Sequence, residues 1–333
     1  MLEKPDINDD VIISCLQTEY GLQVTELTFL PLGADVNTIV YRVISDDVEY
    51  FLKLRKGFDE LSVNIPLFLK SQGVQEIIPP IETELKQGWA DFGDYKLILY
   101  PFIEGKNGFE MELSDSHKRT FGAVLQRIHT VKIPLELQRV IPQETYSPQW
   151  RERVKDLQRQ VEGSTFNDPA AAKLADFIKS KHNEIDHLVK HTEELASELQ
   201  SQSHDLVLCH TDIHGANILI TDDNQFYIVD WDNPLLAPKE RDLMFVGGGI
   251  DNIWRNKRDE SVFYEGYGRT DLDFTMMAYY RYERVIEDLA AYGEQLLLTD
   301  KGGADREQAY RRFIGNFKPG QTIEIADKTY KFL

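Results

Sequence analysis

Cysteine is scarce in this chain of 333 residues, which contains only Cys15 and Cys209, far apart in the sequence. Cys209 ends the apolar run 206–209, which predicts a buried thiol, and the two cysteines form neither a disulfide framework nor a zinc spacing. Apolar runs long enough to cross a membrane are also missing, and the acidic N-terminal segment lacks the pattern of a signal peptide. We therefore expect a cytoplasmic protein.

Basic residues are in deficit, with 37 Lys and Arg against 56 Asp and Glu and a net charge of −19. Such an excess repels nucleic acid and anionic membranes, so we exclude both as partners. The same charge would attract a cationic substrate to an acidic cleft, although many acidic proteins carry it only for solubility. The apolar content of 42% and the length indicate one large or two ordinary globular domains, and we expect a monomer or weak dimer.

Alternation of apolar and polar residues predicts an antiparallel sheet in the first hundred residues. The predicted strands are 24–32, 37–45, 49–55, 77–84 and 94–105, with turns at 33–35 and 46–47. Residues 59–71 are predicted to be helical, although Pro66 favours a break or a late start. A sheet of about five strands with one helix would thus end near Gly105.

From Ser114 onward the apolar period becomes that of a helix, with Ser114 as the N-cap. Further helices are predicted at 148–162, at 169–200 and over most of 258–299, on either side of motif strands at 206–232. These patterns predict an α+β fold. Residues 1–103 would form a sheet lobe that binds a nucleotide, and residues 104–333 a mainly helical catalytic and substrate-binding lobe with a helical insertion.

The strongest chemical signal is VLCHTDIHGANILI at 207–220, followed by FYIVDWD at 226–232. Phosphoryl transfer from ATP requires a carboxylate at the attacking hydroxyl, together with an amide and a second carboxylate on Mg²⁺. Asp212 would serve as the base, and Asn217 and Asp230 as the metal ligands. Alternatively, Asp212 and Asn217 only cap a turn. A carboxylate at the end of a buried strand, as at Asp230, is costly unless it is paired or bound to metal.

Two neighbours of this motif have more than one interpretation. Asp232 is a second ligand, a substrate contact or a structural acceptor. The alternation of His210, Asp212 and His214 would also suit a zinc hydrolase. However, no histidine follows His214 in the sequence, and a zinc site would leave the N-terminal sheet without a role. We therefore expect His214 to be structural.

The first lobe contains the candidate nucleotide contacts. Lys53, on an apolar strand, would pair with phosphates, unless it is merely an exposed strand lysine. Glu60 would orient Lys53, unless it is an ordinary helix N-terminal charge. Gly33 would let backbone N–H groups approach phosphates, although no G-x-G-x-x-G motif is present. The backbone around Tyr100 and Phe102 would bind an adenine edge.

Taken together, Lys53, the 207–220 motif, VDWD at 229–232 and PKERDL at 238–243 resemble the aminoglycoside phosphotransferase family, and the likeness runs over most of the chain. The resemblance implies a bilobal, protein-kinase-like fold that uses ATP and Mg²⁺, with Lys53 on the α- and β-phosphates. It also implies that Asp242 is a structural acceptor that steadies the catalytic loop. The acceptor would be a hydroxyl of a small cationic molecule such as the aminocyclitol antibiotic spectinomycin.

Alternatives to this function remain open. Choline, fructosamine and methylthioribose kinases share the same motifs, and a nucleotide-binding regulator without catalysis is a further possibility. Glu283 and Asp288 would bind an aminocyclitol dication, but segment 279–288 equally fits a packed aromatic face beside a solvated charged face. The glycine run 247–249 predicts a close backbone approach or a mobile loop.

Overall fold

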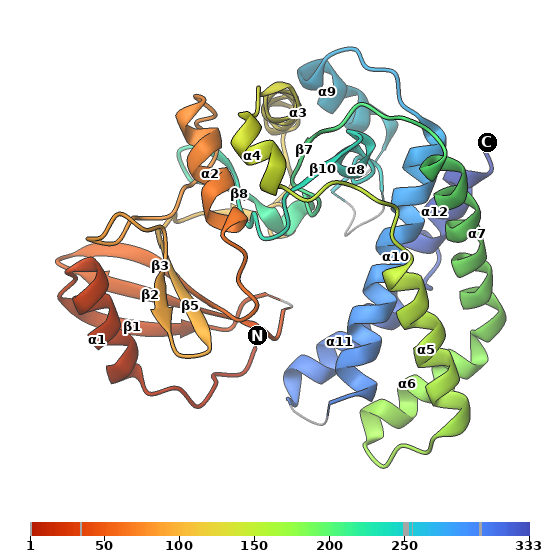
Figure 1. Cartoon of the computed structure of the whole chain (residues 1–333), viewed down its shortest axis with the longest axis horizontal. Coiled ribbons are helices and arrows are strands. Elements are labelled where there is room, and N and C mark those ends of the chain that lie inside the picture. Colours follow the sequence, from red (N-terminus) through yellow and green to blue (C-terminus); the bar gives the residue numbers. More distant parts are fainter. Residues whose placement is uncertain (1, 34, 249–252, 255, 300–301) are drawn as a thin grey trace. The chain divides into compact units, whose positions relative to one another are not determined.

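The structure is a computed structural model that describes residues 2–33, 35–248, 253–254, 256–299 and 302–333 (Figure 1). Contacts group the chain into two compact units. The sheet unit comprises Met1–Leu113 with Gly215–Pro234, and the helical unit comprises Ser114–His214 with Leu235–Leu333. The predicted division of the fold into lobes 1–103 and 104–333 stays a prediction.

The sheet unit is built on a five-stranded antiparallel sheet in the order β1-β2-β3-β5-β4. Its strands are β1 (Val24–Leu30), β2 (Thr38–Ser45), β3 (Val48–Arg55), β4 (Ala90–Phe92) and β5 (Tyr95–Pro101). A second sheet contains β6 (Lys106–Asn107), β8 (Ile218–Ile220) and β9 (Phe226–Ile228), with the short helix η1 (Gly215–Asn217) before β8. The unit also contains helices α1 (Asp9–Tyr20) and α2 (Leu61–Ser71), and α1 contacts β1 and β4 (Figure 1).

Alternation along the strands decides which side chains face α1. The core on that face joins two helical residues to residues of β2, β3, β4 and β5; its members are Ile12, Leu16, Ile39, Tyr41, Val43, Leu52, Leu54, Ala90, Leu97 and Leu99. Lys53 lies between Leu52 and Leu54 on β3, so its side chain leaves the opposite face of the sheet. There it pairs in register with Val40 and Ile98.

Several predictions for the sheet unit are confirmed. The three strands predicted within 24–55 form β1, β2 and β3, and the last run forms β5. Asp46 and Asp47 have φ of 49° and 61°. Positive φ at both central positions of a two-residue hairpin turn matches the right-handed twist of the strands that it joins.

Two expectations for this unit were wrong, and one helix was missed. Run 77–84 is not a strand, because Pro79 and Pro80 lack the N–H groups that strand pairing requires. Within this run, only Ile77 forms an isolated bridge, to Ile228. The short β4 takes the fifth place in the sheet instead. Pro66 does not interrupt α2, whose buried apolar face runs through it. Helix α1 was not predicted, although Asn8 caps its N-terminus and Gly21 ends it in the left-handed region.

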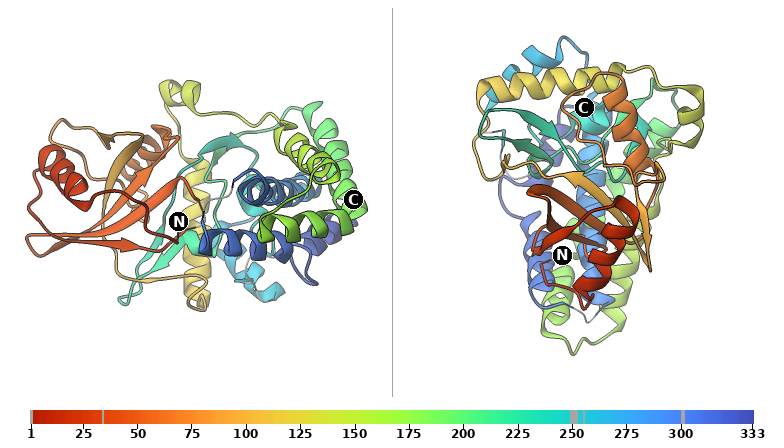
Figure 2. Two further views of the ribbon diagram at one scale, coloured as in Figure 1. Left: turned by 90° about the horizontal axis from the view of Figure 1, so that it is seen from below. Right: turned by 90° about the vertical axis from the view of Figure 1, so that its left-hand side faces the viewer.

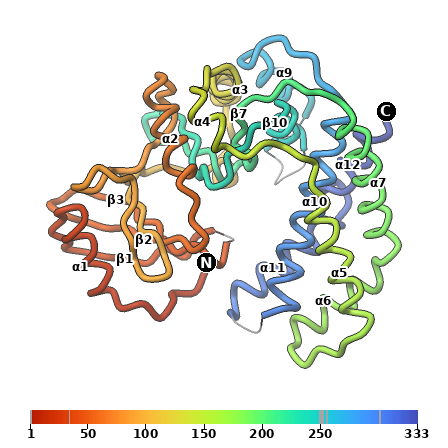
Figure 3. Tube along the Cα trace, in the orientation of Figure 1, coloured from red at the N-terminus to blue at the C-terminus, as the bar shows by residue number. Residues whose placement is uncertain are grey.

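The helical unit is organised around α10 (Phe274–Leu297), which contacts six other helices (Figures 1 and 2). These are α5 (Gln149–Gly163), α6 (Pro169–Ser180), α7 (His182–Gln200), α8 (Glu240–Leu243), α11 (Ala304–Gly315) and α12 (Thr322–Tyr330). The predicted helix 169–200 is therefore two helices, and the tube in Figure 3 follows α5, α6 and α7 in succession. No helix among the residues that the structure describes is both long and apolar enough to cross a membrane.

In a second part of the helical unit, α3 (Asp115–Thr130) packs against α9 (Lys257–Tyr267). The short α4 (Leu135–Val140) follows α3 in the sequence. Ser114 caps α3 in a reciprocal capping box, as predicted. Gly122 and Gly266 let the two helix backbones touch, since a Cβ on Gly266 would clash with the carbonyl of Arg119. The strands β7 (Val207–Cys209) and β10 (Leu235–Ala237) pair antiparallel and carry the chain into and out of the motif region.

Candidate functional site

Lys53 occupies the centre of a charged cluster in the sheet unit. Its Nζ lies 2.7 Å from Asp230 Oδ1 and 2.7 Å from Asp232 Oδ1, and its side chain is only 8% exposed. Burial lowers the pKa of Lys53, but the two carboxylates outweigh burial and hold the pKa above its ordinary value. The lysine is therefore a fixed cation rather than an exposed strand residue.

Asp230 is placed by the β8–β9 hairpin. The N–H of Val229 donates to the carbonyl of Asn217 at 3.0 Å, which ties the end of β9 to the start of β8. Asp230 then adopts φ of 68°, a conformation that costs a non-glycine residue free energy and that clusters at functional sites. Its side chain is 43% exposed, against 16% for Asp232. The hairpin thus presents one accessible and one largely covered carboxylate to Lys53.

Arg55 is a member of this cluster that sequence reasoning missed. Its Nη1 lies 2.9 Å from Asp35 Oδ2 and 2.5 Å from Asp232 Oδ2. Asp35 begins the turn before β2, where its side chain accepts from the N–H of Asn37 at 2.8 Å. Gly33, two positions earlier, has φ of 84°, which favours glycine. The signal was present in the sequence, because residues two apart on a strand share a face and Arg55 is two residues after Lys53.

The structure does not bring Glu60 to Lys53. Glu60 is exposed at the N-cap of α2, and the acidic partners of Lys53 among the described residues are Asp230 and Asp232. No Lys53–Glu60 ion pair occurs among the described residues, and a role for Glu60 in orienting Lys53 stays a prediction.

The segment predicted to bind adenine continues the edge of the sheet. Tyr100 pairs with Phe51 in the β3–β5 ladder. The N–H of Phe102 donates to the carbonyl of Glu49 at 3.2 Å. These bonds fix the backbone of the segment, and the adenine contact stays a prediction.

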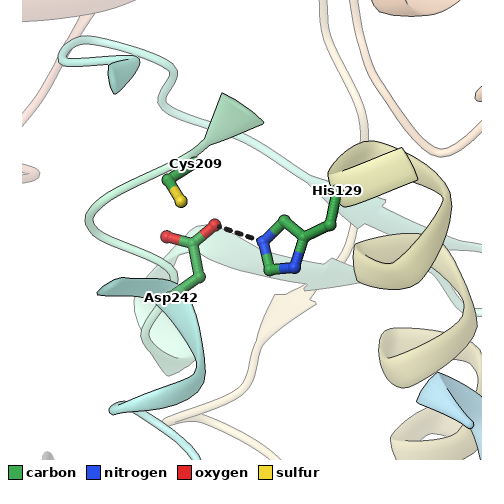
Figure 4. Close-up of side chains that lie close together, drawn as sticks. All are labelled: His129, Cys209 and Asp242. Carbon is green, nitrogen blue, oxygen red and sulfur yellow. Dashed lines mark hydrogen bonds and ion pairs between the residues drawn. The ribbon is translucent and has the colours of Figure 1, made fainter. Parts of the chain in front are cut away.

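In the helical unit, Asp242 holds the loop that carries Asp212. The backbone N–H groups of His210 and Thr211 donate to Asp242 Oδ2 and Oδ1 at 2.8 and 2.7 Å, and His129 Nε2 lies 3.1 Å from Oδ2 (Figure 4). Burial raises the pKa of the Asp242 carboxyl, but His129 and the backbone donors outweigh burial and lower it. The expectation that Asp242 is the acceptor that steadies this loop is confirmed.

His129, Cys209 and Asp242 lie close enough to suggest a metal site (Figure 4). Their polar atoms are already engaged, however, since His129 Nδ1 lies 2.7 Å from the Tyr267 hydroxyl and both Asp242 oxygens accept backbone N–H groups. Burial raises the pKa of the Cys209 thiol well above its ordinary value, so it is not a thiolate. The cluster is a hydrogen-bonded support, and Cys209 is buried as predicted.

Asp212 itself is flanked by two nitrogen-bearing side chains. Arg284 Nη1 lies 2.6 Å from Oδ1, and His214 Nε2 lies 3.5 Å from Oδ2. Burial raises the pKa of the Asp212 carboxyl, but Arg284, His214 and His210 outweigh burial and hold the pKa well below its usual range. Asp212 is therefore an ionised carboxylate whose side chain is 35% exposed.

The acidic residues predicted to meet a substrate on α10 are paired within the helical unit. Glu283 Oε2 lies 2.8 Å from Arg151 Nη1, and Asp288 Oδ1 lies 3.3 Å from Arg284 Nε. Burial raises the pKa of Glu283 to about 7. The aromatic residues of the same segment are packed in the interior, as the alternative interpretation held; they are Tyr279, Tyr280 and Tyr282. A substrate role for Glu283 and Asp288 stays a prediction.

The start of the glycine run 247–249 makes the predicted close approach. Gly247 has φ of 70°, and a Cβ on Gly248 would clash with the carbonyl of Met244. Arg281 donates to the carbonyls of Met244 and Val246 at 3.1 and 2.9 Å. These contacts fix the backbone that leads into the glycine run, while Gly249 lies outside the described residues.

A sequence model of the phosphotransferase enzyme family (APH) matches residues 28–282. The chain belongs to this family. The earlier resemblance to aminoglycoside phosphotransferases is thereby confirmed, as are the protein-kinase-like α+β fold and the assignment as a small-molecule phosphotransferase. The family match favours the phosphotransferase interpretation of the motif over the metallohydrolase one.

Two solved structures of this phosphotransferase family are similar over nearly the whole chain. Spectinomycin phosphotransferase APH(9)-Ia in complex with ADP and spectinomycin has 37% identity and a TM-score of 0.90, with 98% of this chain and 100% of that chain covered. Its AMP-bound complex has 35% identity and a TM-score of 0.85, covering 96% and 98%. Choline kinase LicA from Streptococcus pneumoniae, at 14% identity, a TM-score of 0.61 and coverage of 96% and 99%, shares the fold alone.

Proposed function

We propose that this phosphotransferase transfers the γ-phosphoryl group of ATP, with Mg²⁺, to a hydroxyl group of spectinomycin or a closely related aminocyclitol. The likeness to spectinomycin phosphotransferase carries this proposal, because 37% identity extends over 98% of the chain rather than over the shared motifs alone. The net charge of −19 supports a cationic acceptor.

The residues of the sheet unit suit a magnesium nucleotide. Asp230 and the side-chain amide of Asn217 supply the oxygen ligands that Mg²⁺ prefers, and the exposed carboxylate of Asp230 leaves room for a metal with its own waters. Bound Mg²⁺ would neutralise charge that develops on the phosphates. Lys53 would then exchange part of its contact with Asp230 for the α- and β-phosphates, while buried Asp232 keeps its position.

Asp212 would orient the acceptor hydroxyl and receive its proton. A carboxylate with a lowered pKa is a weak base, yet phosphoryl transfer through a loose transition state needs little proton removal before the P–O bond forms. We therefore assign Asp212 mainly an orienting role, with proton acceptance late in the step. Asp242 serves this role indirectly, since it fixes the backbone on either side of the His210–Thr211 peptide.

A coupled assay of ADP release with spectinomycin, choline and ethanolamine tests the proposal. We expect spectinomycin-dependent turnover and a product whose mass is raised by one phosphoryl group. Asp212→Asn should lower kcat by about 10²–10⁴-fold while nucleotide affinity is kept. Turnover of choline or ethanolamine in place of spectinomycin would overturn the acceptor assignment, and wild-type kcat in Asp212→Asn would overturn the role of Asp212.

A further inference from the structure

Arg284 links two carboxylates in the helical unit. From α10, its Nη1 reaches Asp212 Oδ1 at 2.6 Å, and its Nε lies 3.3 Å from Asp288 Oδ1 one helical turn further on. The guanidinium group lies 5.9 Å from the ring centroid of Phe245, so the ring covers one of its faces. The side chain is 17% exposed. Arg284 is thus held in place independently of Asp212.

We propose that Arg284 is a positioning residue for Asp212, and that Asp288 acts through Arg284. This inference rests on the proposed function and adds to it the residue that sets the orientation and charge of the reacting carboxylate. In this role Arg284 acts through its contact with Asp212 and takes no proton.

The physical need for such a residue follows from the charges around Asp212. Its carboxylate would otherwise lie close to a second carboxylate, that of Asp288, and like charges at short range favour protonation of one of them. Arg284 lies between the two and pairs with both. A planar guanidinium also restricts rotation of the carboxylate more than a single ammonium would.

The two histidines beside Asp212 do not take the place of Arg284. His210 and His214 come from the same loop as Asp212, and His214 Nε2 lies at 3.5 Å from Oδ2. A histidine carries a full positive charge only when protonated. Arg284, in contrast, carries a permanent charge, and it is the largest of the influences that lower the pKa of Asp212.

The proposal is tested with Arg284→Gln, Arg284→Lys and Asp288→Asn, and with Arg153→Gln as a matched control. Arg153 is also an arginine that reaches a carboxylate of α10, Glu294, at 3.5 Å, but it makes no contact with Asp212. We expect Arg284→Gln to lower kcat with the best acceptor by about 10–100-fold, within the range of acid–base contributions. The KM for ATP should stay within about twofold. Arg284→Lys should recover part of kcat, and Arg153→Gln should match the wild type.

Two further measurements separate positioning from general support of the fold. The pH dependence of kcat should show an acidic limb at higher pH in Arg284→Gln than in the wild type, because Asp212 then loses its permanent counter-charge. Asp288→Asn should add little to the loss in the Arg284→Gln background, because residues that act through one another are non-additive. Additive losses, or an unmoved acidic limb, would overturn the proposal.

Carbon-13 NMR of the Asp212 carboxyl, assigned by its disappearance in Asp212→Asn, gives a readout that needs no acceptor. The carboxyl should titrate at higher pH in Arg284→Gln than in the wild type, and an identical titration would contradict the inference. If no acceptor is phosphorylated by the wild type, the proposed function fails while this titration still decides the role of Arg284. Should Arg284→Gln not fold, Arg284→Lys carries the same comparison with a smaller expected shift.

Discussion

Lys53 Nζ and Asp230 Oδ1 lie 2.7 Å apart although 177 positions separate the two residues in the chain. The pair joins the middle of β3 to the end of β9, and Asp232 completes the cluster from the same hairpin. In the proposed function, this buried and ionised lysine would exchange one of its carboxylate partners for a phosphate.

Replacing Lys53 by methionine should remove this cation while keeping the volume of the side chain. We expect kcat/KM for ATP to fall by about 100-fold, which is the scale for loss of one charged donor at a phosphoryl group. Steady-state kinetics at saturating acceptor measure this effect. Lys56→Met is the control, since Lys56 is exposed and lies over the Tyr95 ring at 4.8 Å. An equal loss in both variants would show that the effect is not specific to Lys53.

Arg55 should contribute to nucleotide binding through the turn that Asp35 begins before β2. Arg55 joins Asp35 to Asp232, so Arg55→Gln should release this turn and weaken ATP affinity by about tenfold, or about 1.4 kcal/mol. Calorimetric titration with a non-hydrolysable ATP analogue and Mg²⁺ measures the change. Lys4→Gln removes an exposed pair with Asp9 at the start of α1 and should leave the affinity unchanged. Unaltered binding in Arg55→Gln would refute the assignment.

The contact of α3 with α9 should depend on the absence of a side chain at Gly266. A Cβ there meets the backbone of Arg119 rather than a flexible side chain, so Gly266→Ala should lower the free energy of unfolding by about 1–3 kcal/mol. Gly315 on α11 has open space around its Cβ position. Gly315→Ala should therefore be neutral or stabilise by up to about 1 kcal/mol. Thermal and urea unfolding compare the two, and equal effects would argue against close helix packing.

Glu283 should make stability depend on pH. Its pKa is raised from 4.5 to about 7 in the folded state, mainly by burial, so the native protein binds more protons than the unfolded chain between these values. Stability contributed by the protonated form is present below pH 4.5 and is lost as pH rises to 7. Across that window, the wild type should lose about 3 kcal/mol relative to Glu283→Gln. Urea unfolding at several pH values measures the difference, and parallel curves would mean that Arg151 keeps Glu283 ionised throughout.

Much of the architecture was predictable because local patterns and tertiary structure agree. The hairpins of 24–55 follow from alternation and from turn residues, and α3 follows from its apolar period and from Ser114. The errors fall where local signals are short or conflict with packing. Strand β4 has three residues, too few for a period, and the buried face of α2 overrides the preference of Pro66 to end a helix.

The sequence by itself determined the family chemistry, because the order and spacing of Asp212, Asn217, Asp230 and Asp242 identify a phosphotransferase before any fold is known. Only the tertiary structure decided which acidic and basic side chains form ion pairs. The pairing of Lys53 with Asp230 and Asp232, and that of Arg284 with Asp212 and Asp288, join segments between which no sequence period exists. Coulombic pairing depends on the distance between two charges and on their burial. The packing of β3 with the β8–β9 hairpin sets this distance and burial for Lys53. The packing of α10 with the loop after β7 sets them for Arg284.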